Sequence, residues 1–267
     1  MKLELLLSTM NLKNEEENRE LIKKMNVTIN SLTINQITDE NIIESNDLKC
    51  PNRLISVRDK GLSKSRNMAI SNSESDICII ADDDVIYKDN FQDIIYKEYD
   101  KNNKYDVICF FVESSNNERK IKRMISSKVG RLRAMRIRSV EITFRKKSII
   151  DNNIKFKENF GAGTCCDRGE ETIFLWECIK KGLKIKFVNK KIADVSYKES
   201  TWFKGFNEAF FVMQGQVFYE LSNDFSHFLI LQFAIRKYHI YRKKFSLFQV
   251  IKLMNSQIPV VKRKNTK

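Results

Sequence analysis

The sequence is poor in three residue types: its 267 residues include only two prolines, eight glycines and two histidines. Such low Pro and Gly contents exclude collagen-like chains and linkers rich in these residues. His227 and His239 lie at no spacing typical of metal ligands, and the six cysteines lack the paired spacing of a zinc site. We therefore expect no structural zinc, and we expect cysteines that remain thiols.

Long apolar segments are also missing. The opening MKLELLLSTMN has a short apolar stretch that Glu4 interrupts, so it does not resemble a secretory signal. The run FLILQFAI is eight residues long and contains a glutamine, which makes it too short to cross a bilayer. We therefore expect a cytoplasmic protein, for which any contact with the inner face of the cell membrane is peripheral.

Acidic residues are absent from two stretches of a chain whose net charge is +14. Residues 119–138 contain nine Lys and Arg, and residues 225–267 contain ten. Such patches bind phosphate-bearing partners, which include nucleic acid, anionic lipid and phosphorylated substrates. A nucleic-acid-binding protein that uses both stretches is therefore one hypothesis that the charge pattern supports.

Strand-like and helix-like patterns alternate over the first 200 residues. We predict strands at 2–8, 27–34, 52–57, 76–81, 105–113, 140–149 and 183–189, and helices at 15–25, 61–73, 90–99 and 169–182. This alternation predicts an α/β fold with a mainly parallel sheet flanked by helices. From Thr201 onward, aromatic residues at helical spacing predict a basic helical extension, so we expect units at 1–200 and 201–267 that pack together.

In the segment DICIIADDDVIY, three consecutive aspartates directly follow the strand-like run DICIIA. Carboxylates this close repel one another, and the loop after a strand is where open α/β sheets bind ligands. A divalent cation between carboxylate and phosphate oxygens would relieve this repulsion. Asp82 and Asp84, on either side of Asp83, have the Asp-x-Asp spacing of such a metal site. A nucleotidyl- or phosphoryl-transfer enzyme would also use clustered aspartates, but no Gly-rich phosphate loop with a lysine is present.

Three segments occur in an order that resembles the family 2 glycosyltransferases, which are inverting nucleotide-sugar enzymes of GT-A fold. DKGLSKSRNMAI resembles the family's Gly-x-Ser-x-x-Arg-Asn segment, ADDD its metal loop, and FGAGTCCDRGEET the segment in which Gly-Glu-Asp opens a helix. The resemblance covers residues 1 to about 200. It implies a GT-A (Rossmann-like) fold and a hexosyltransferase-type enzyme of polysaccharide biosynthesis.

The resemblance also implies roles for individual residues. Glu171 stands where the family has the Asp that takes the acceptor's proton, and Glu170 is its neighbour in the same helix turn. Asp82 and Asp84 would hold Mn²⁺ or Mg²⁺, with Asp84 favoured as the ligand. The residues implied in nucleotide-sugar binding are Thr9, Asn11, Asn35, Gln36, Ser63, Arg66, Asn67, Asp82 and Asp83. For recognition of the nucleotide base two alternatives are open: the amide groups of Asn35 and Gln36, or Asp39.

The acceptor side has weaker signals. Gly161 and Gly163 suit a backbone that passes close to the sugar, and Trp202 would stack on an acceptor sugar or lie in the core. The resemblance implies a UDP-sugar donor and an acceptor that is a saccharide or a lipid-diphosphate-linked glycan. The basic extension would hold the enzyme at an anionic membrane surface, and no nucleic-acid partner is then expected. The sequence predicts no oligomeric state.

Overall fold

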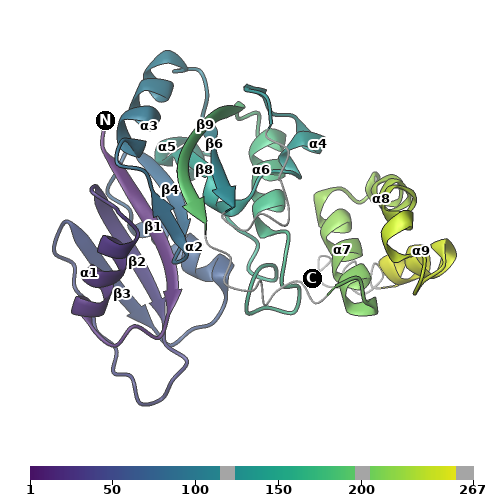
Figure 1. Cartoon of the computed structure of the whole chain (residues 1–267), viewed down its shortest axis with the longest axis horizontal. Coiled ribbons are helices and arrows are strands. Elements are labelled where there is room, and N and C mark those ends of the chain that lie inside the picture. The colour runs from purple at the N-terminus through teal and green to yellow at the C-terminus, as the bar shows by residue number, and fades with distance from the viewer. Residues whose placement is uncertain (115–123, 196–204, 257–267) are drawn as a thin grey trace.

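The computed structural model describes residues 1–114, 124–195 and 205–256, and Figure 1 shows their arrangement. Within these ranges the strands form one nine-stranded sheet of order β3-β2-β1-β4-β8-β6-β9-β5, in which β7 also pairs with β9. The strands are β1 (Leu3–Met10), β2 (Asn30–Gln36), β3 (Asn52–Val57), β4 (Ile77–Asp82), β5 (Val85–Tyr87), β6 (Val107–Ser114), β7 (Ser127–Lys128), β8 (Ile142–Arg145) and β9 (Ile185–Val195). Trp202 lies outside the described residues, as do residues 119–123 of the first basic stretch.

Strands β3, β2, β1 and β4 are neighbours and all parallel, so their carboxyl ends meet at one edge of the sheet. Beyond them, β8 runs antiparallel to both β4 and β6, and β9 is parallel to β6. The predicted α/β fold with a helix-flanked sheet is confirmed. Its continuous parallel part is the half that carries the predicted donor-binding loops.

Helices cover both faces of this sheet. They are α1 (Glu15–Lys24), α2 (Leu62–Asn72), α3 (Phe91–Lys101), α4 (Arg131–Ala134), α5 (Lys146–Asp151), α6 (Glu170–Lys180), α7 (Glu208–Leu221), α8 (Ser226–Tyr241) and α9 (Leu247–Asn255), with a 3-10 helix η1 (Ser139–Glu141). Along β1, Leu5 and Leu7 belong to the apolar cluster that contains α1 and α3. Leu6 belongs instead to the larger cluster with α2, α5 and α6. Successive side chains of a strand point to opposite faces, so β1 is apolar on both.

Two local predictions differ from the structure. The segment 140–149, predicted as one strand, is a strand only over β8, and helix α5 follows directly. A short apolar stretch cannot be assigned to strand or helix from periodicity alone, which explains this error. The sequence prediction also missed β5, because its three residues form a strand only by pairing with β9. That pairing extends β9 to Val195, past the predicted end at residue 189.

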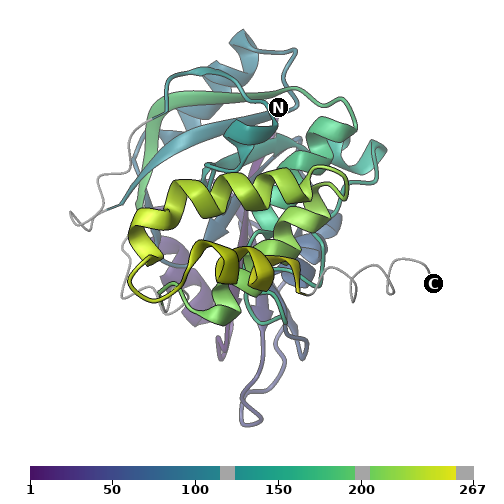
Figure 2. The same ribbon diagram turned by 90° about the vertical axis from the view of Figure 1, so that its right-hand side faces the viewer.

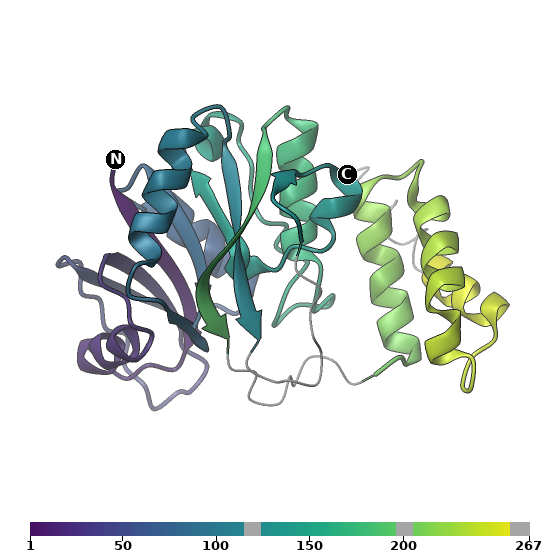
Figure 3. The ribbon, with the colours of Figure 1, turned by 45° about the horizontal axis from the view of Figure 1, so that its top comes forward.

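The C-terminal helices form a layer beside the sheet (Figures 1 and 3). Helix α7 contacts α6, and α8 and α9 pack on α7 and on each other. Figure 2 shows α8 crossing the outer side of this layer. A Cβ atom at Gly215 of α7 would lie 1.9 Å from the carbonyl oxygen of Met254 in α9, so the two backbones are in contact. The division into units 1–200 and 201–267 stays a prediction.

Replacing Gly215 should therefore disrupt the contact between α7 and α9. We expect Gly215→Ala to lower the free energy of unfolding by about 1–3 kcal/mol, the usual cost of overpacking, or more because the clash involves backbone. Chemical denaturation measures this change. Gly130→Ala is the matched control, since its Cβ would meet no atom within 4 Å. Equal stability of the two variants would contradict the close approach of the helices.

Candidate active site

The three aspartates lie where β4 ends, at the edge formed by the parallel strands. The hydroxyl of Thr9, near the end of β1, donates to Asp83 Oδ2 at 2.7 Å. Ser139 of η1 donates to Asp82 Oδ2 at 3.3 Å. The acidic loop is thus held from two sides by hydroxyl groups. The predicted donor residue Thr9 lies next to the aspartates, as its place at the end of the first strand indicates.

Arg66 connects the acidic loop to the start of α6. Its side chain is only 1% exposed, and it donates to Asp82 Oδ1 at 2.9 Å and to Glu170 Oε1 at 2.8 Å. Burial disfavours the charge, but the two carboxylates outweigh it and raise the pKa of Arg66 above its usual value. A permanent cation therefore joins three segments that are far apart in the sequence.

The two glutamates that open α6 have different surroundings. Glu170 is buried against Arg66, so its charge is balanced by an ion pair. Glu171 is half-buried and lines the pocket beside it. Burial and the negative charge of Glu170 raise the pKa of Glu171 to about 8. A carboxylate with a pKa near neutrality is a better proton acceptor than an ordinary one, and such a shift is typical of a general base.

Asp84 has the surroundings expected of a cation ligand. Burial, together with the charges of Asp82 and Asp83, raises the pKa of Asp84 to about 6. In the ranges that the structure describes, no ion pair balances this carboxylate, whereas Arg66 balances Asp82. The same ranges contain no group of three or more His, Cys, Asp or Glu placed to hold a metal. Mg²⁺ at a phosphate needs only one or two carboxylates, so Asp84 with Asp82 fits it.

One pocket of about 290 Å³ joins these groups. It is lined by Leu62, Arg66, Asp82, Asp84, Arg138, Ser139, Val140, Ala162, Asp167, Arg168, Gly169, Glu170, Glu171 and Val195. The aspartate loop and the start of α6 therefore form walls of the same cavity. Because β4 ends at the acidic loop and α6 begins at the glutamates, the fold itself places acidic groups around one space.

Arg138 and Arg168 line this pocket, although no motif singled out either residue. The Arg168 guanidinium lies over the ring of Phe210 in α7, 4.4 Å from its centroid, and pairs with Asp167 at 3.0 Å. Arg138 pairs with Glu141 at 3.0 Å. The sequence signal that could have identified Arg168 as a pocket residue is its position directly before the Gly-Glu-Glu segment. Arg138 is the last residue of the first basic stretch, which was expected to border the site.

Helix α7 also supports the loop that leads into α6. Gly169, the residue before α6, has a φ of +83°, and a Cβ there would lie 2.6 Å from the Val217 side chain. The Cys166 thiol donates to the Met213 carbonyl oxygen at 3.7 Å. Helix α7 is therefore in direct contact with the loop that forms the Glu171 side of the pocket.

Several predicted donor-binding side chains hold the loops of this edge together. They bond mainly to backbone groups: Asn35 to Leu12, Gln36 to Gly61, Ser63 to Phe160, Asn67 to Phe156, and Asn11 to Thr38 and Asp39. Each bond joins segments from different parts of the chain. Their binding of the nucleotide stays a prediction, while the structure gives these side chains a positioning role.

The predicted acceptor glycines lie in the loop that packs on α2. A Cβ at Gly161 would lie 3.2 Å from both Glu170 Cγ and Ser63 Oγ, and its φ is +98°. Gly163 has a φ of +82° and lies against Lys60. Gly161 therefore allows the loop to approach the Arg66–Glu170 ion pair closely. Acceptor binding by either glycine, and by Trp202 outside the described residues, stays a prediction.

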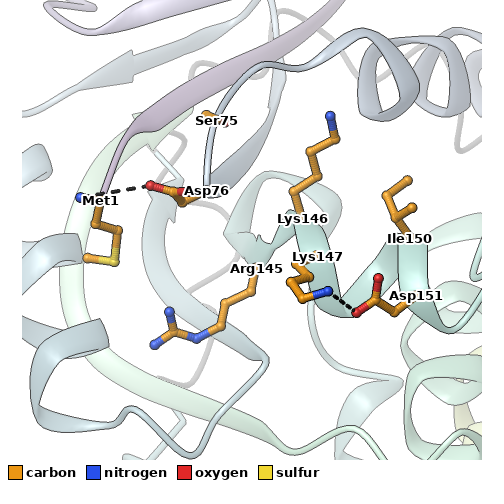
Figure 4. A pocket seen from close by; sticks show the side chains of 8 residues that line it. All are labelled: Met1, Ser75, Asp76, Arg145, Lys146, Lys147, Ile150 and Asp151. Atoms are coloured by element: carbon orange, nitrogen blue, oxygen red, sulfur yellow. Dashed lines mark hydrogen bonds and ion pairs between the residues drawn. The ribbon is translucent and has the colours of Figure 1, made fainter.

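A second hollow, of about 610 Å³, lies at the opposite edge of the sheet (Figure 4). It is lined by residues that precede β1 and β4 or follow β8. Among its charged groups, the amino terminus pairs with Asp76 at 3.8 Å and Lys147 pairs with Asp151 at 2.7 Å. Since parallel α/β sheets bind ligands at the carboxyl ends of their strands, the pocket at Asp84 is the candidate active site.

Comparisons with known proteins give a consistent result. A family model described as Glycosyl transferase family 2 matches residues 40–166. The fold is similar to that of S. aureus TarS 1–349 in complex with UDP-GlcNAc, with a TM-score of 0.63 and 16% identity over 91% of this chain and 74% of that one. The complex of the same fragment with UDP gives a TM-score of 0.60 at 16% identity, with the same coverage. A structure titled S. aureus TarS gives 0.60 at 16% identity, over 90% of this chain and 44% of that one. No curated protein matches significantly.

The family match and the similar fold support a nucleotide-sugar glycosyltransferase of GT-A fold, and the acidic groups lie at the carboxyl edge of its parallel strands. The family match includes α2, β4 and the aspartates, and it ends at residue 166, before Glu170 and Glu171. Over residues 40–166 the chain is similar to the family 2 glycosyltransferases, as the order of its motifs predicts, and this similarity supports a glycosyltransferase. This result favours an enzyme over the nucleic-acid-binding hypothesis.

The Arg66 ion pairs should be essential for stability. Arg66→Gln leaves two buried or half-buried carboxylates without their cation, so we expect a loss of about 3–5 kcal/mol in the free energy of unfolding. Lys147→Gln is the control, because its ion pair with Asp151 joins two exposed side chains and such pairs contribute at most about 1 kcal/mol. Adding Glu170→Gln to Arg66→Gln should recover part of the loss. Similar denaturation midpoints for Arg66→Gln and Lys147→Gln would refute this role.

Proposed function

We propose that this glycosyltransferase moves a sugar from a UDP-sugar donor to an acceptor hydroxyl with inversion at the anomeric carbon. One observation carries the proposal: Arg66 pairs with Asp82 and Glu170, and it thereby leaves Asp84 and Glu171 as the carboxylates whose pKa values are raised in one pocket. Asp84 is suited to bind a cation beside the diphosphate, and Glu171 is suited to accept the proton of the acceptor hydroxyl.

Glu171 is the proposed general base. Inversion in a single displacement requires a base on the acceptor side, which takes the hydroxyl proton as the nucleoside diphosphate leaves from the opposite side. Glu170 is a poor candidate for this step, because its charge is already balanced by Arg66 at 2.8 Å. Its negative charge acts instead on Glu171, whose carboxylate it makes more basic.

Asp84, with Asp82, is the proposed holder of Mn²⁺ or Mg²⁺. A divalent cation at this place supplies positive charge that stabilises the departing diphosphate. Arg66 keeps Asp82 in place, and the Thr9 hydroxyl keeps Asp83 in place, so the loop is positioned before any ligand binds. The donor class is supported by the similar fold of TarS, whose structures are titled as complexes with UDP-GlcNAc and UDP.

The proposed acceptor is a saccharide or a lipid-diphosphate-linked glycan of polysaccharide biosynthesis, met at the inner face of an anionic membrane. Arg138 and Arg168 place two guanidinium groups on the pocket lining, which suits an acceptor or donor that carries phosphate. The basic extension suits a lipid surface rich in phosphate. Among the described helices, none is long and apolar enough to span a bilayer.

Substituting the base should separate binding from chemistry. Glu171→Gln keeps the shape of the side chain but accepts no proton, so donor affinity should persist while transfer falls by about a hundred- to ten-thousand-fold. Single-turnover transfer and UDP-sugar binding measure the two quantities. If Glu170→Gln rather than Glu171→Gln abolishes transfer, the assignment is wrong by one residue.

The pH dependence tests the same assignment. The base acts when deprotonated, and burial and Glu170 raise its pKa to about 8, so kcat/KM should rise with pH and level off above about 8. Glu170→Gln removes one cause of the raised pKa, so its profile should shift to lower pH. A profile that is flat between about pH 6 and 9, or unmoved by Glu170→Gln, would contradict the account.

The aspartate loop should trade stability for activity. Asp84→Asn removes a carboxylate that burial and two neighbouring charges disfavour, so at neutral pH the protein should remain folded or become slightly more stable. UDP release from a UDP sugar in the presence of Mn²⁺ should nevertheless fall by orders of magnitude, and chelation should abolish it reversibly. Asp100→Asn, on the exposed end of α3, serves as the control. Full activity in a chelator would disprove the metal role.

A further inference from the structure

Helix α8 presents apolar side chains to solvent on the face that points away from the protein. Phe228, Leu231, Ile235 and Tyr238 are 53%, 46%, 57% and 42% exposed. They are spaced three, four and three residues apart, which places them on one side of the helix. The side chains on its other side, including Leu229, Ile230, Phe233 and Ala234, are buried in the core.

This pattern is unusual for a surface helix. A helix on the surface of a soluble protein carries an apolar stripe toward the core and polar residues on its outer face. In α8 both faces are apolar, although Figure 2 shows the helix crossing the outer side of the molecule. The outer face therefore has the composition of a surface that is covered when the protein functions.

The charged residues within α8 and directly after it are all positive. Arg236 lies in the second half of α8, and Arg242, Lys243 and Lys244 follow it directly, all with exposed side chains. Residues 225–256 contain no Asp or Glu. An exposed apolar helix face with Lys and Arg along its C-terminal half and directly after it is typical of a helix lying in the interface of an anionic membrane.

We propose that the outward face of α8 docks on an anionic lipid surface, with Phe228 and Ile235 inserted at the boundary between headgroups and acyl chains. The cationic residues after Tyr238 then meet the lipid phosphates. This inference rests on the membrane partner proposed above. It assigns the contact to one helix face within the described residues, where the sequence had indicated the whole segment 225–267.

A second copy of the chain is a less suitable occupant of this face. In a symmetric dimer the same patch faces itself, so the cations of one copy would lie against those of the other. No acidic residue between Phe225 and Ser256 is available to pair with them. Anionic lipid headgroups supply the complementary charge.

The outward face of α8 is separate from the catalytic machinery. Helix α7 lies between α8 and the loop at Arg168, and it is α7 that contacts this loop through Phe210 and Val217. Variants on the outward face of α8 should therefore leave UDP release from the donor unchanged. This separation allows lipid binding and donor chemistry to be measured independently in the same protein.

The test is co-sedimentation of the full chain with vesicles of phosphatidylcholine alone or mixed with phosphatidylglycerol. We expect binding to the anionic vesicles that weakens with salt. The double variant Phe228→Gln/Ile235→Gln should bind these vesicles at least about tenfold more weakly than the wild type, because two inserted side chains are lost. Ile43→Gln/Ile150→Gln is the control, since these side chains are 83% and 49% exposed elsewhere. It should bind like the wild type.

Further arms distinguish the outcomes. Removing residues 257–267 deletes four cations but no part of α8, so most of the apolar contribution should persist. If the α8 double variant binds like the wild type, the assignment to α8 is overturned while the membrane partner stands. If the wild type ignores anionic vesicles, both are overturned, and donor hydrolysis still tests the transferase separately. A concentration-dependent dimer that the double variant abolishes would assign this face to a second copy instead. Equal melting temperatures exclude misfolding as the cause.

Discussion

The buried guanidinium of Arg66 is the interaction on which the rest of the site depends. It pairs with Asp82 after β4 and with Glu170 at the start of α6, and these two groups are 88 residues apart in the chain. Without this cation, five carboxylates would crowd one end of the sheet and repel one another. With it, Asp82 and Glu170 are held in ion pairs, while burial and neighbouring negative charges raise the pKa values of Asp84 and Glu171. A single ion-pair network thus separates the groups that hold the pocket from those that face ligands.

The sequence predicted the parts of this arrangement that depend on local pattern. Strands β1, β3 and β4 and helices α2 and α6 begin and end close to their predicted bounds, because long apolar periodicities specify them. The order of motifs also placed Arg66, the aspartates and the two glutamates at one site. The pairing of Arg66 with Glu170 rather than Glu171 could not be predicted, since it depends on the direction of side chains at the first turn of α6. Strand β5 and the stacking of Arg168 on Phe210 arise from long-range contacts that leave no local signal.

The C-terminal helices are part of the site's support as well as an appendage. Helix α7 contacts the loop before α6 through Phe210, Met213 and Val217, and α9 in turn packs on α7 at Gly215. The wall that carries Glu171 is therefore positioned from the sheet side by Arg66 and from the opposite side by α7. The exposed apolar face of the outer helix α8 takes part neither in the packing of α7 and α9 nor in the support of this wall. The extension therefore has one side that packs on the loop before α6 and another side with an exposed apolar face.

The central claim is that Arg66 leaves Glu171, and not Glu170, as the basic carboxylate of the pocket. The most direct measurement is an NMR titration of the glutamate side-chain carboxyl carbons in the free enzyme, with Glu171→Gln and Glu170→Gln used to assign the two signals. We expect the Glu171 signal to titrate near pH 8, because burial and the charge of Glu170 raise the pKa of Glu171. A Glu171 signal that titrates at the ordinary value for a glutamate, near pH 4.5, would contradict it.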